Sequence, residues 1–334
     1  MSRRRPPPPR LVDLHIPWML QYVGETTQND PADYPPMAPR LGQVSGYLNT
    51  ARAAFIPAAR SARDWDRQAD PWAALGLSIA RIEAEFPGRI LADRGDFGRW
   101  RDDPEGLTWA VLGIAGFDSI AREANDLDRL PGLVTRGARL FRPVERPGGS
   151  MGGAGFEGDD RGLTPLGADF LAALRQSAPE EGALLVDLSP MSPACRRDAL
   201  DWFESDGSRA DRLLPIFSPI SIDPERPGSL DEDGLRRLRA LGGCLGLGAG
   251  LPYHDSSEDL RRSLERAAEF PFQGEPGPRG IGIATDFLGR DTVAEGLETA
   301  EAIARWLAGA FDAGRASAWG RGNGEEFIAR ICGA

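Results

Sequence analysis

Histidine is nearly absent from this chain, since only His15 and His254 occur among its 334 residues. Cysteine is scarce too: Cys195, Cys244 and Cys332 are the whole complement, and no two of them form a CxxC pair. Three widely spaced thiols imply neither a structural zinc knuckle nor a disulfide framework. We therefore expect reduced thiols in a cytoplasmic protein.

Long apolar runs are also missing. No stretch of about 18 apolar residues occurs, so no transmembrane helix is predicted, and the start, MSRRRPPPPR, lacks the apolar core of a signal peptide. Positive charge is outnumbered, with 39 Lys and Arg against 50 Asp and Glu and a net charge of −11. Binding to phosphates needs clustered Lys and Arg, so we expect neither a nucleic-acid nor a membrane partner.

Several common catalytic motifs do not occur. There is no GxSxG nucleophile elbow and no HExxH zinc motif, so the usual serine-hydrolase and zincin interpretations have no support. The glycine-rich stretch at 148–162 lacks the Gly-Lys-Ser/Thr ending of a phosphate-binding loop. We interpret that stretch as a loop over one face of the molecule.

The sequence does contain an alternation of short apolar runs and amphipathic stretches. We interpret as strands the runs at 11–18, 108–117, 138–144, 183–189, 214–218, 244–250 and 280–287, with ILADRG near Ile90 as the second of eight. Helices are predicted at about 72–86, 165–174, 196–203, 231–241, 258–269 and, as the last, 299–311. This pattern favours an α/β fold, a single-domain (β/α)8 barrel of the TIM type over 11–334, after a disordered Arg/Pro-rich tail at 1–10.

Six short motifs follow one another along the chain. They are GLTPLG (162–167), VDLSPMS (186–192), PIFSPIS (215–221), the pair Gly242-Gly243, IGIATDFLG (281–289) and WGRGNGEEFIAR (319–330). In this order they resemble strand-end segments of the membrane (renal) dipeptidases, a family of zinc metallopeptidases. The resemblance implies a barrel like those of the metal-dependent hydrolases over most of the chain, with a dipeptidase ancestry.

The resemblance also implies two zinc ions held at the strand ends, and here the sequence departs from the family. Ala115 stands in place of the bridging glutamate of the third strand, and Pro190 and Pro219 replace the histidines of the fifth and sixth. None of these side chains can bind a metal. We therefore predict a divergent member without the zinc cofactor, while a single metal at Asp13 and His15 stays open.

Other family positions keep polar residues. The H-x-D of the first strand matches Asp13 and His15 in inverted order, or His15 alone, and we expect both side chains to share one side, which faces the barrel mouth or interior. The resemblance implies that Asp286 acts as an acid or base and that Glu145 contacts the substrate. It also implies that Arg226 binds the substrate carboxylate. Asp286, Asp13 and His15 are thus the candidate catalytic residues, with Arg226 and Glu145 as candidate substrate-binding residues.

These observations favour two functions of different class. A barrel that has lost zinc would be a pseudoenzyme that binds a small peptide-like ligand or a partner, and the sequence leaves a homo-oligomer open. A rebuilt one-metal or metal-free carboxylate site would instead hydrolyse dipeptides or amides. A third interpretation makes the tail at 1–10 a docking arm. His254, in the loop after the seventh strand, stays open as a metal ligand or a capping residue.

Overall fold

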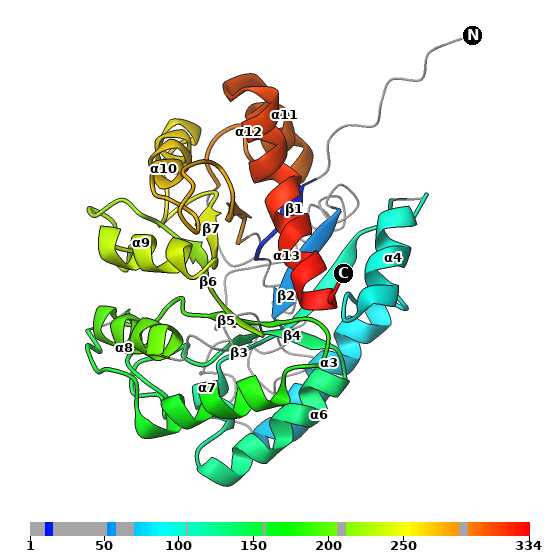
Figure 1. Cartoon of the computed structure of the whole chain (residues 1–334), viewed down its shortest axis with the longest axis vertical. Coiled ribbons are helices and arrows are strands. Elements are labelled where there is room, and N and C mark those ends of the chain that lie inside the picture. The colour runs from blue at the N-terminus through cyan, green and yellow to red at the C-terminus, as the bar shows by residue number, and fades with distance from the viewer. Residues whose placement is uncertain are drawn as a thin grey trace, which may run out of the picture.

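The computed structural model describes residues 11–15, 52–57, 70–104, 106–155, 158–205, 212–286 and 293–334. Eight parallel strands form one sheet in the order β1 to β8, with helices around the outside (Figure 1). The strands are β1 (Val12–Asp13), β2 (Ala53–Pro57), β3 (Trp109–Ala115), β4 (Ala138–Arg142), β5 (Leu184–Asp187), β6 (Leu213–Ile220), β7 (Cys244–Gly248) and β8 (Ile281–Ala284).

The helices follow the strands in alternation from β3 onward, and none of those described is long and apolar enough to cross a membrane. They are α3 (Pro71–Glu85), α4 (Arg94–Asp102), α5 (Phe117–Ile120), α6 (Leu130–Thr135), α7 (Pro165–Ser177), α8 (Pro193–Ser205), α9 (Glu232–Ala240), α10 (Ser257–Glu269), α11 (Ala300–Ala310), α12 (Ala313–Ser317) and α13 (Asn323–Cys332), with the short turns η3 (Ala124–Arg129) and η4 (Ala318–Gly322).

The sheet curls until its two outer strands meet. The backbone N–H of Leu14 donates to the carbonyl oxygen of Ile283 at 2.9 Å, and that of Asp286 donates to the carbonyl oxygen of His15 at 3.0 Å. Eight parallel strands that return on themselves inside a ring of helices are a (β/α)8 barrel, so the predicted fold class is confirmed.

Side chains at the helix starts explain where several helices begin. Asp70, Thr164, Asp231, Ser256 and Thr299 each precede a helix and accept a hydrogen bond from a backbone N–H of its first turn. Such a cap satisfies a donor that has no partner within the helix. The predictions near 72–86, 165–174, 231–241, 258–269 and 299–311 are confirmed within a few residues.

The core has two parts, one inside the barrel and one between the sheet and the helices. Alternate strand residues such as Leu140, Leu185 and Ile216 point inward and pack with one another. The inner cluster also contains Phe327 and Ile331 of α13, which closes the amino-terminal end of the barrel. Two hydrogen bonds hold that helix in place. The Asn323 side-chain amide donates to the Ile281 carbonyl oxygen at 2.7 Å, and the backbone N–H of Ala183 donates to the carbonyl oxygen of Arg330 at 3.0 Å.

Two predictions of secondary structure are wrong. The second strand is β2, and Ile90 only forms an isolated bridge with Ala110. The β2 segment, AAFIP, is short and begins with two alanines, so its apolar signal does not stand out from its surroundings. The helix at 299–311 is not the last, because α12 and α13 follow it. The tail at 1–10 and the ends of two predicted strands, 16–18 and 287, lie outside the described residues.

Candidate functional site

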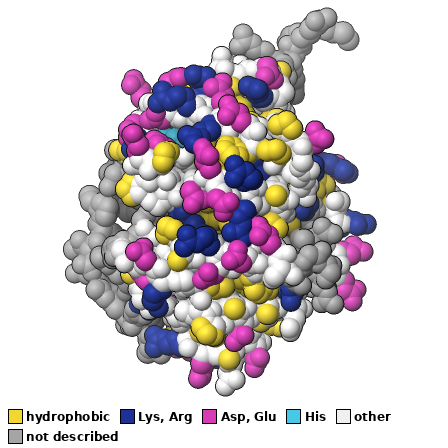
Figure 2. Space-filling view, turned by 60° about the vertical axis from the view of Figure 1, so that its left-hand side comes forward, with side chains coloured by type: hydrophobic (Ala, Val, Ile, Leu, Met, Phe, Trp, Pro, Cys, Tyr) yellow, Lys and Arg dark blue, Asp and Glu magenta, His cyan; other side chains and the backbone are white. Residues whose placement is uncertain are grey.

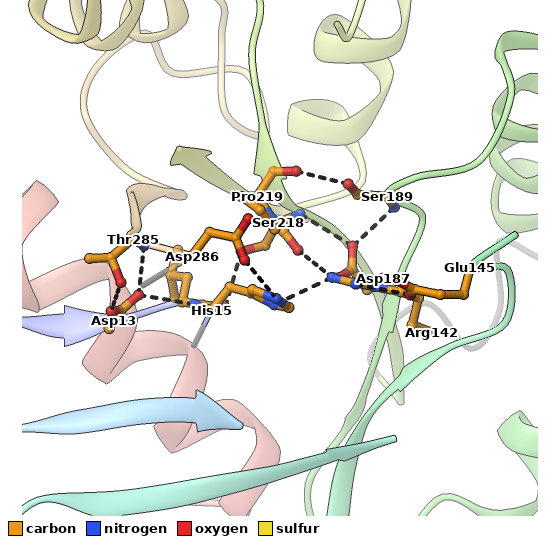
Figure 3. Close-up of polar contacts among 11 residues, drawn as sticks. Asp13, His15, Arg142, Glu145, Asp187, Ser189, Ser218, Pro219, Thr285 and Asp286 are labelled. Atoms are coloured by element: carbon orange, nitrogen blue, oxygen red, sulfur yellow. Dashed lines mark hydrogen bonds and ion pairs between the residues drawn. The ribbon is translucent and has the colours of Figure 1, made fainter. Parts of the chain in front are cut away.

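An arginine occupies the middle of the barrel mouth, at the carboxyl ends of the strands. Arg142 ends β4, two residues after the inward-facing Leu140. Its Nε and Nη2 donate to Asp187 Oδ2 at 3.0 and 2.6 Å, its Nη1 donates to Glu145 Oε2 at 3.1 Å, and its Nη2 also donates to the Ser218 carbonyl oxygen at 2.8 Å (Figure 3). Strands β4, β5 and β6 thus converge on one guanidinium group.

Opposite charges within this network stabilise one another. Burial lowers the pKa of Arg142, but Asp187 and Glu145 act in the opposite direction and leave its pKa raised, so the guanidinium stays charged. Burial raises the pKa of Asp187 to about 6, while Arg142 and the backbone N–H groups of Ser189 and Ser218, at 3.0 and 3.2 Å from Oδ1, act to lower it. Arg142 and Asp187 therefore form an ion pair at neutral pH.

His15 lies on the other side of the same guanidinium. Its Nδ1 is 3.3 Å from Arg142 Nη2, and its Nε2 is 3.6 Å from Asp286 Oδ1 (Figure 3). Because a guanidinium can only donate, Nδ1 must accept, and a neutral His15 then carries its proton on Nε2, toward Asp286. Asp286 has φ of 51°, in the left-handed region that few residues other than glycine, asparagine and aspartate adopt.

The side chain of Asp13 has other partners than that of His15, at the junction of the first and last strands. Its Oδ1 accepts from the backbone N–H groups of Thr285 and His15 at 3.0 and 3.1 Å, and its Oδ2 accepts from the Thr285 hydroxyl at 2.5 Å. Strand β1 ends at Asp13, so alternation does not extend to residue 15. Asp13 ties the end of β1 to the end of β8.

The donor set of the described mouth does not fit the dinuclear zinc site that the resemblance implies. Ala115 ends β3, Pro190 lies three residues after the end of β5, and Pro219 lies within β6. Alanine and proline side chains offer no ligand atom. Among the described residues, no group of three or more His, Cys, Asp or Glu is arranged to hold a metal ion. The carboxylate of Asp187 is instead bound to the cation of Arg142.

Arg226 lies apart from this network, in the loop after β6. It pairs with Asp255, and its Nη2 and Nε are 3.7 Å from Asp259 and 3.8 Å from Asp223. Of the residues singled out from the sequence, the structure thus gathers His15, Asp286 and Glu145 around one arginine, with Asp13 adjacent to them. Arg226 belongs to the rim.

The residues at the centre of the network were not predicted from the sequence. Arg142 and Asp187 both lie in segments that were predicted to be strands, two residues after inward apolar positions. A charged residue two positions after an inward-facing apolar residue, at the carboxyl end of a barrel strand, is a sequence signal that could have identified both residues.

Asp118 is a second buried acid that the sequence analysis missed. It lies in α5, its Oδ2 accepts from the backbone N–H groups of Glu145 and Arg146 at 3.1 and 3.2 Å, and its Oδ1 has no hydrogen-bond partner among the described residues. Burial is the main cause that raises the pKa of Asp118 to about 7. This carboxyl therefore holds the loop that carries Glu145.

Comparison with known proteins places the fold. No protein-family model and no curated protein matches the sequence. Among solved structures, the chain is similar to a dipeptidase of metallopeptidase family M19, with a TM-score of 0.67, 17% identity, and coverage of 97% of this chain and 99% of that one. It is similar to an amidohydrolase from Pseudomonas aeruginosa, with a TM-score of 0.69, 13% identity and 97% coverage of both chains.

A third similar structure is a metallopeptidase from Rhodobacter sphaeroides that is bound to a phosphinate mimic of the dipeptide L-Ala-D-Ala. Its TM-score is 0.68 at 16% identity, and the match covers 97% of this chain and 99% of that one. These likenesses run over nearly the whole of each chain. The protein therefore has the fold of the membrane dipeptidase barrels, as the sequence motifs predicted.

Proposed function

We propose that this protein is a dipeptidase-like barrel that has lost the dinuclear zinc site and, with it, conventional zinc dipeptidase activity. We further propose that it binds a small peptide-like ligand or a partner at its loop face. The supporting observation is the Arg142 guanidinium, which is hydrogen-bonded to Asp187 and Glu145 at the barrel mouth. An internal cation thus pairs with carboxylates of the mouth in place of a metal.

Electrostatics supports this proposal. Two unit charges about 4 Å apart interact by about 4 kcal/mol at an effective dielectric constant of about 20, and a divalent ion doubles that repulsion from a guanidinium. Moving Arg142 out of the way would leave Asp187 buried without its partner, which costs about 3–5 kcal/mol. Zinc would have to overcome one of these two terms, the repulsion if Arg142 stays or the displacement cost if Arg142 moves, and would do so without the histidines that the resemblance implies at the positions of Pro190 and Pro219.

Separate observations support the proposed ligand class and location. A similar solved barrel is described with a phosphinate mimic of a dipeptide, and for the present chain this suggests a peptide-like ligand. We place the protein in the cytoplasm, which agrees with three buried cysteines that are all free thiols.

Calorimetry with dipeptides tests the proposal. We expect the same affinity for a dipeptide such as Ala-Ala in the presence of zinc and in the presence of a chelator, and no release of free amino acids in either case. Cleavage that appears on adding zinc and disappears with the chelator would contradict the proposal.

A second function has one observation in its favour. Asp286 Oδ1 lies 3.6 Å from His15 Nε2 in the mouth, a pairing that can support general acid/base hydrolysis of a dipeptide or amide through a metal-free or one-metal site. For this alternative, Asp286→Asn should abolish amide hydrolysis while the protein remains folded. Unchanged hydrolysis in that variant would remove the alternative.

A further inference from the structure

A pocket of about 290 Å³ opens on the loop side of the barrel, apart from the Arg142 network. It lies between the loop after β6 and helix α10, and its volume is close to the lower end of the range of small-molecule sites, about 300–1,000 Å³. The residues that line it are Ile222, Asp223, His254, Asp259, Arg262, Ser263 and Arg266.

His254 lies in this pocket with a defined proton position. Burial is the largest influence on its pKa and lowers it below the usual 6.5, and Arg226 acts in the same direction; Gly248, Asp259 and Asp223 oppose them. The ring is therefore neutral at pH 7 and has one N–H. Its Nδ1 is 2.7 Å from the Gly248 carbonyl oxygen, which can only accept, so the proton is on Nδ1.

That assignment makes Nε2 of His254 a free base toward a hydroxyl. Ser263 Oγ, on α10, lies 2.8 Å from Nε2 and must donate to it. A nucleophile within about 2.6–3.2 Å of a base, which is itself oriented by a third group, is the arrangement that activates serine in acyl transfer. Here the third group is the backbone carbonyl of Gly248.

Two arginines can stabilise the negative charge that such a reaction develops. Arg266 lies three residues after Ser263, so both lie on one face of α10, and Arg262 also lines the pocket. Arg266 is anchored by Glu232, which its Nη2 reaches at 2.5 Å. Guanidinium groups beside a reacting carbonyl can take the part of an oxyanion hole.

The charge of the pocket indicates the kind of substrate. Asp223 and Asp259 balance Arg262 and Arg266 in its lining. In Figure 2, acidic and basic side chains alternate over the face shown, without a patch of one sign. A balanced pocket of this size suits a small uncharged or zwitterionic ester better than a polyanion.

We propose that this rim pocket is an ester-hydrolysing site in which Ser263 is the nucleophile and His254 the base. Ser263 Oγ attacks the ester carbonyl carbon as its proton passes to His254 Nε2, and the resulting oxyanion faces the arginines. The carbon–oxygen bond to the alcohol breaks, and the alcohol leaves with the proton from Nε2. A water molecule, deprotonated by the same nitrogen, then hydrolyses the acyl-serine and restores both residues.

A fluorophosphonate probe tests the nucleophile in the unaltered protein. We expect a phosphonyl adduct on Ser263, found by peptide mass spectrometry, with fluoride released. Its rate of formation should rise as the pH rises through the lowered pKa of His254 and stay level above it. An adduct on another residue, or none at a probe concentration that labels a known serine esterase, would overturn the proposal.

Variants then test turnover with p-nitrophenyl acetate. General-base catalysis contributes about 100-fold or more, so Ser263→Ala and His254→Gln should each lower kcat/KM by at least that factor. Ser257→Ala is the matched control, because Ser257 opens the same helix outside the pocket lining and should keep full activity. Hydrolysis that persists in a folded Ser263→Ala variant would contradict the assignment, and the labelling result stands even if that variant does not fold.

Discussion

The two histidines of this chain lie in opposite kinds of environment. His15 lies at the barrel mouth among formal charges, 3.3 Å from the Arg142 guanidinium and 3.6 Å from the Asp286 carboxylate. His254 lies at the rim between two neutral partners, a backbone carbonyl at 2.7 Å and the Ser263 hydroxyl at 2.8 Å. Both rings are buried.

The comparison shows two ways in which a buried histidine ring is held. At the mouth, the ring lies beside an arginine that is hydrogen-bonded to the carboxylates of Asp187 and Glu145, and at the rim each ring nitrogen has a neutral partner. We therefore expect the loss of a charged side chain at the mouth to lower the free energy of unfolding strongly. The loss of a side chain at the rim should change reactivity more than it changes the free energy of unfolding.

The largest effect should come from removing the central cation. Arg142→Met leaves the fully buried Asp187 without its ion-pair partner, and we expect the free energy of unfolding to fall by about 3–5 kcal/mol in urea denaturation. The double variant Arg142→Met/Asp187→Asn should recover a large part of this loss, because it removes the unpaired charge. A loss below about 1 kcal/mol in the single variant would show that the network contributes little to stability.

Next in size is a pH effect at Asp118, beneath the loop that carries Glu145. Its pKa is about 7 when folded against a usual value of 3.8, so the folded state binds the proton more tightly. Its contribution to stability is complete below pH 3.8 and is lost as the pH rises through 7.

The variant Asp118→Asn isolates that contribution. At about 1.4 kcal/mol per pKa unit, the difference in free energy of unfolding between wild type and variant should change by a few kcal/mol between pH 4 and pH 8, in favour of the variant at high pH. Urea denaturation at several pH values measures it. Parallel pH curves for the two proteins would mean that Asp118 is ionised in the folded state.

A smaller effect is expected where β1 meets β8. Thr285→Val removes the hydroxyl that donates to Asp13 Oδ2 but keeps the backbone N–H bond to Oδ1. Hydrogen bonds to charged groups contribute about 1.5–3 kcal/mol, so thermal or urea unfolding should show a loss in that range. Thr285→Ser, which keeps the hydroxyl, is the control and should lose less.

The smallest effect on stability should be at the rim. Ser263→Ala removes one neutral hydrogen bond to His254 beside an open pocket, and we expect a loss of about 1 kcal/mol. Urea denaturation of this variant beside Arg142→Met compares the two histidine environments directly. A loss of stability in Ser263→Ala as large as that in Arg142→Met would contradict the expected difference between the two histidine environments.

Much of the fold could be predicted from the sequence, because each signal was local. Apolar runs such as 183–189 and capping residues such as Thr164 mark their elements without reference to the rest of the chain. The strand β2 was missed because five small or apolar residues carry little periodicity. Helix α13 was missed because its place at the base of the barrel depends on tertiary contacts such as those of Phe327.

The candidate site could be predicted only in part. Motif resemblance singled out His15, Asp286 and Glu145, and the structure brings these three together because strand ends meet at the mouth of any such barrel. It did not identify Arg142, whose pairing with Asp187 joins residues 45 apart in sequence. The Ser263–His254 contact was not predicted from the sequence for a different reason, because a serine in the middle of a helix has no motif around it.

The most direct test of the account is the metal content of untagged protein, purified without chelators and without added metal and measured by mass spectrometry. If Arg142 pairs with the carboxylates of the mouth in place of zinc, then zinc, iron and manganese should each be close to zero per chain. One or two tightly held metal ions per chain would contradict the account and would make His15, Asp286 and Glu145 the first residues to test as ligands.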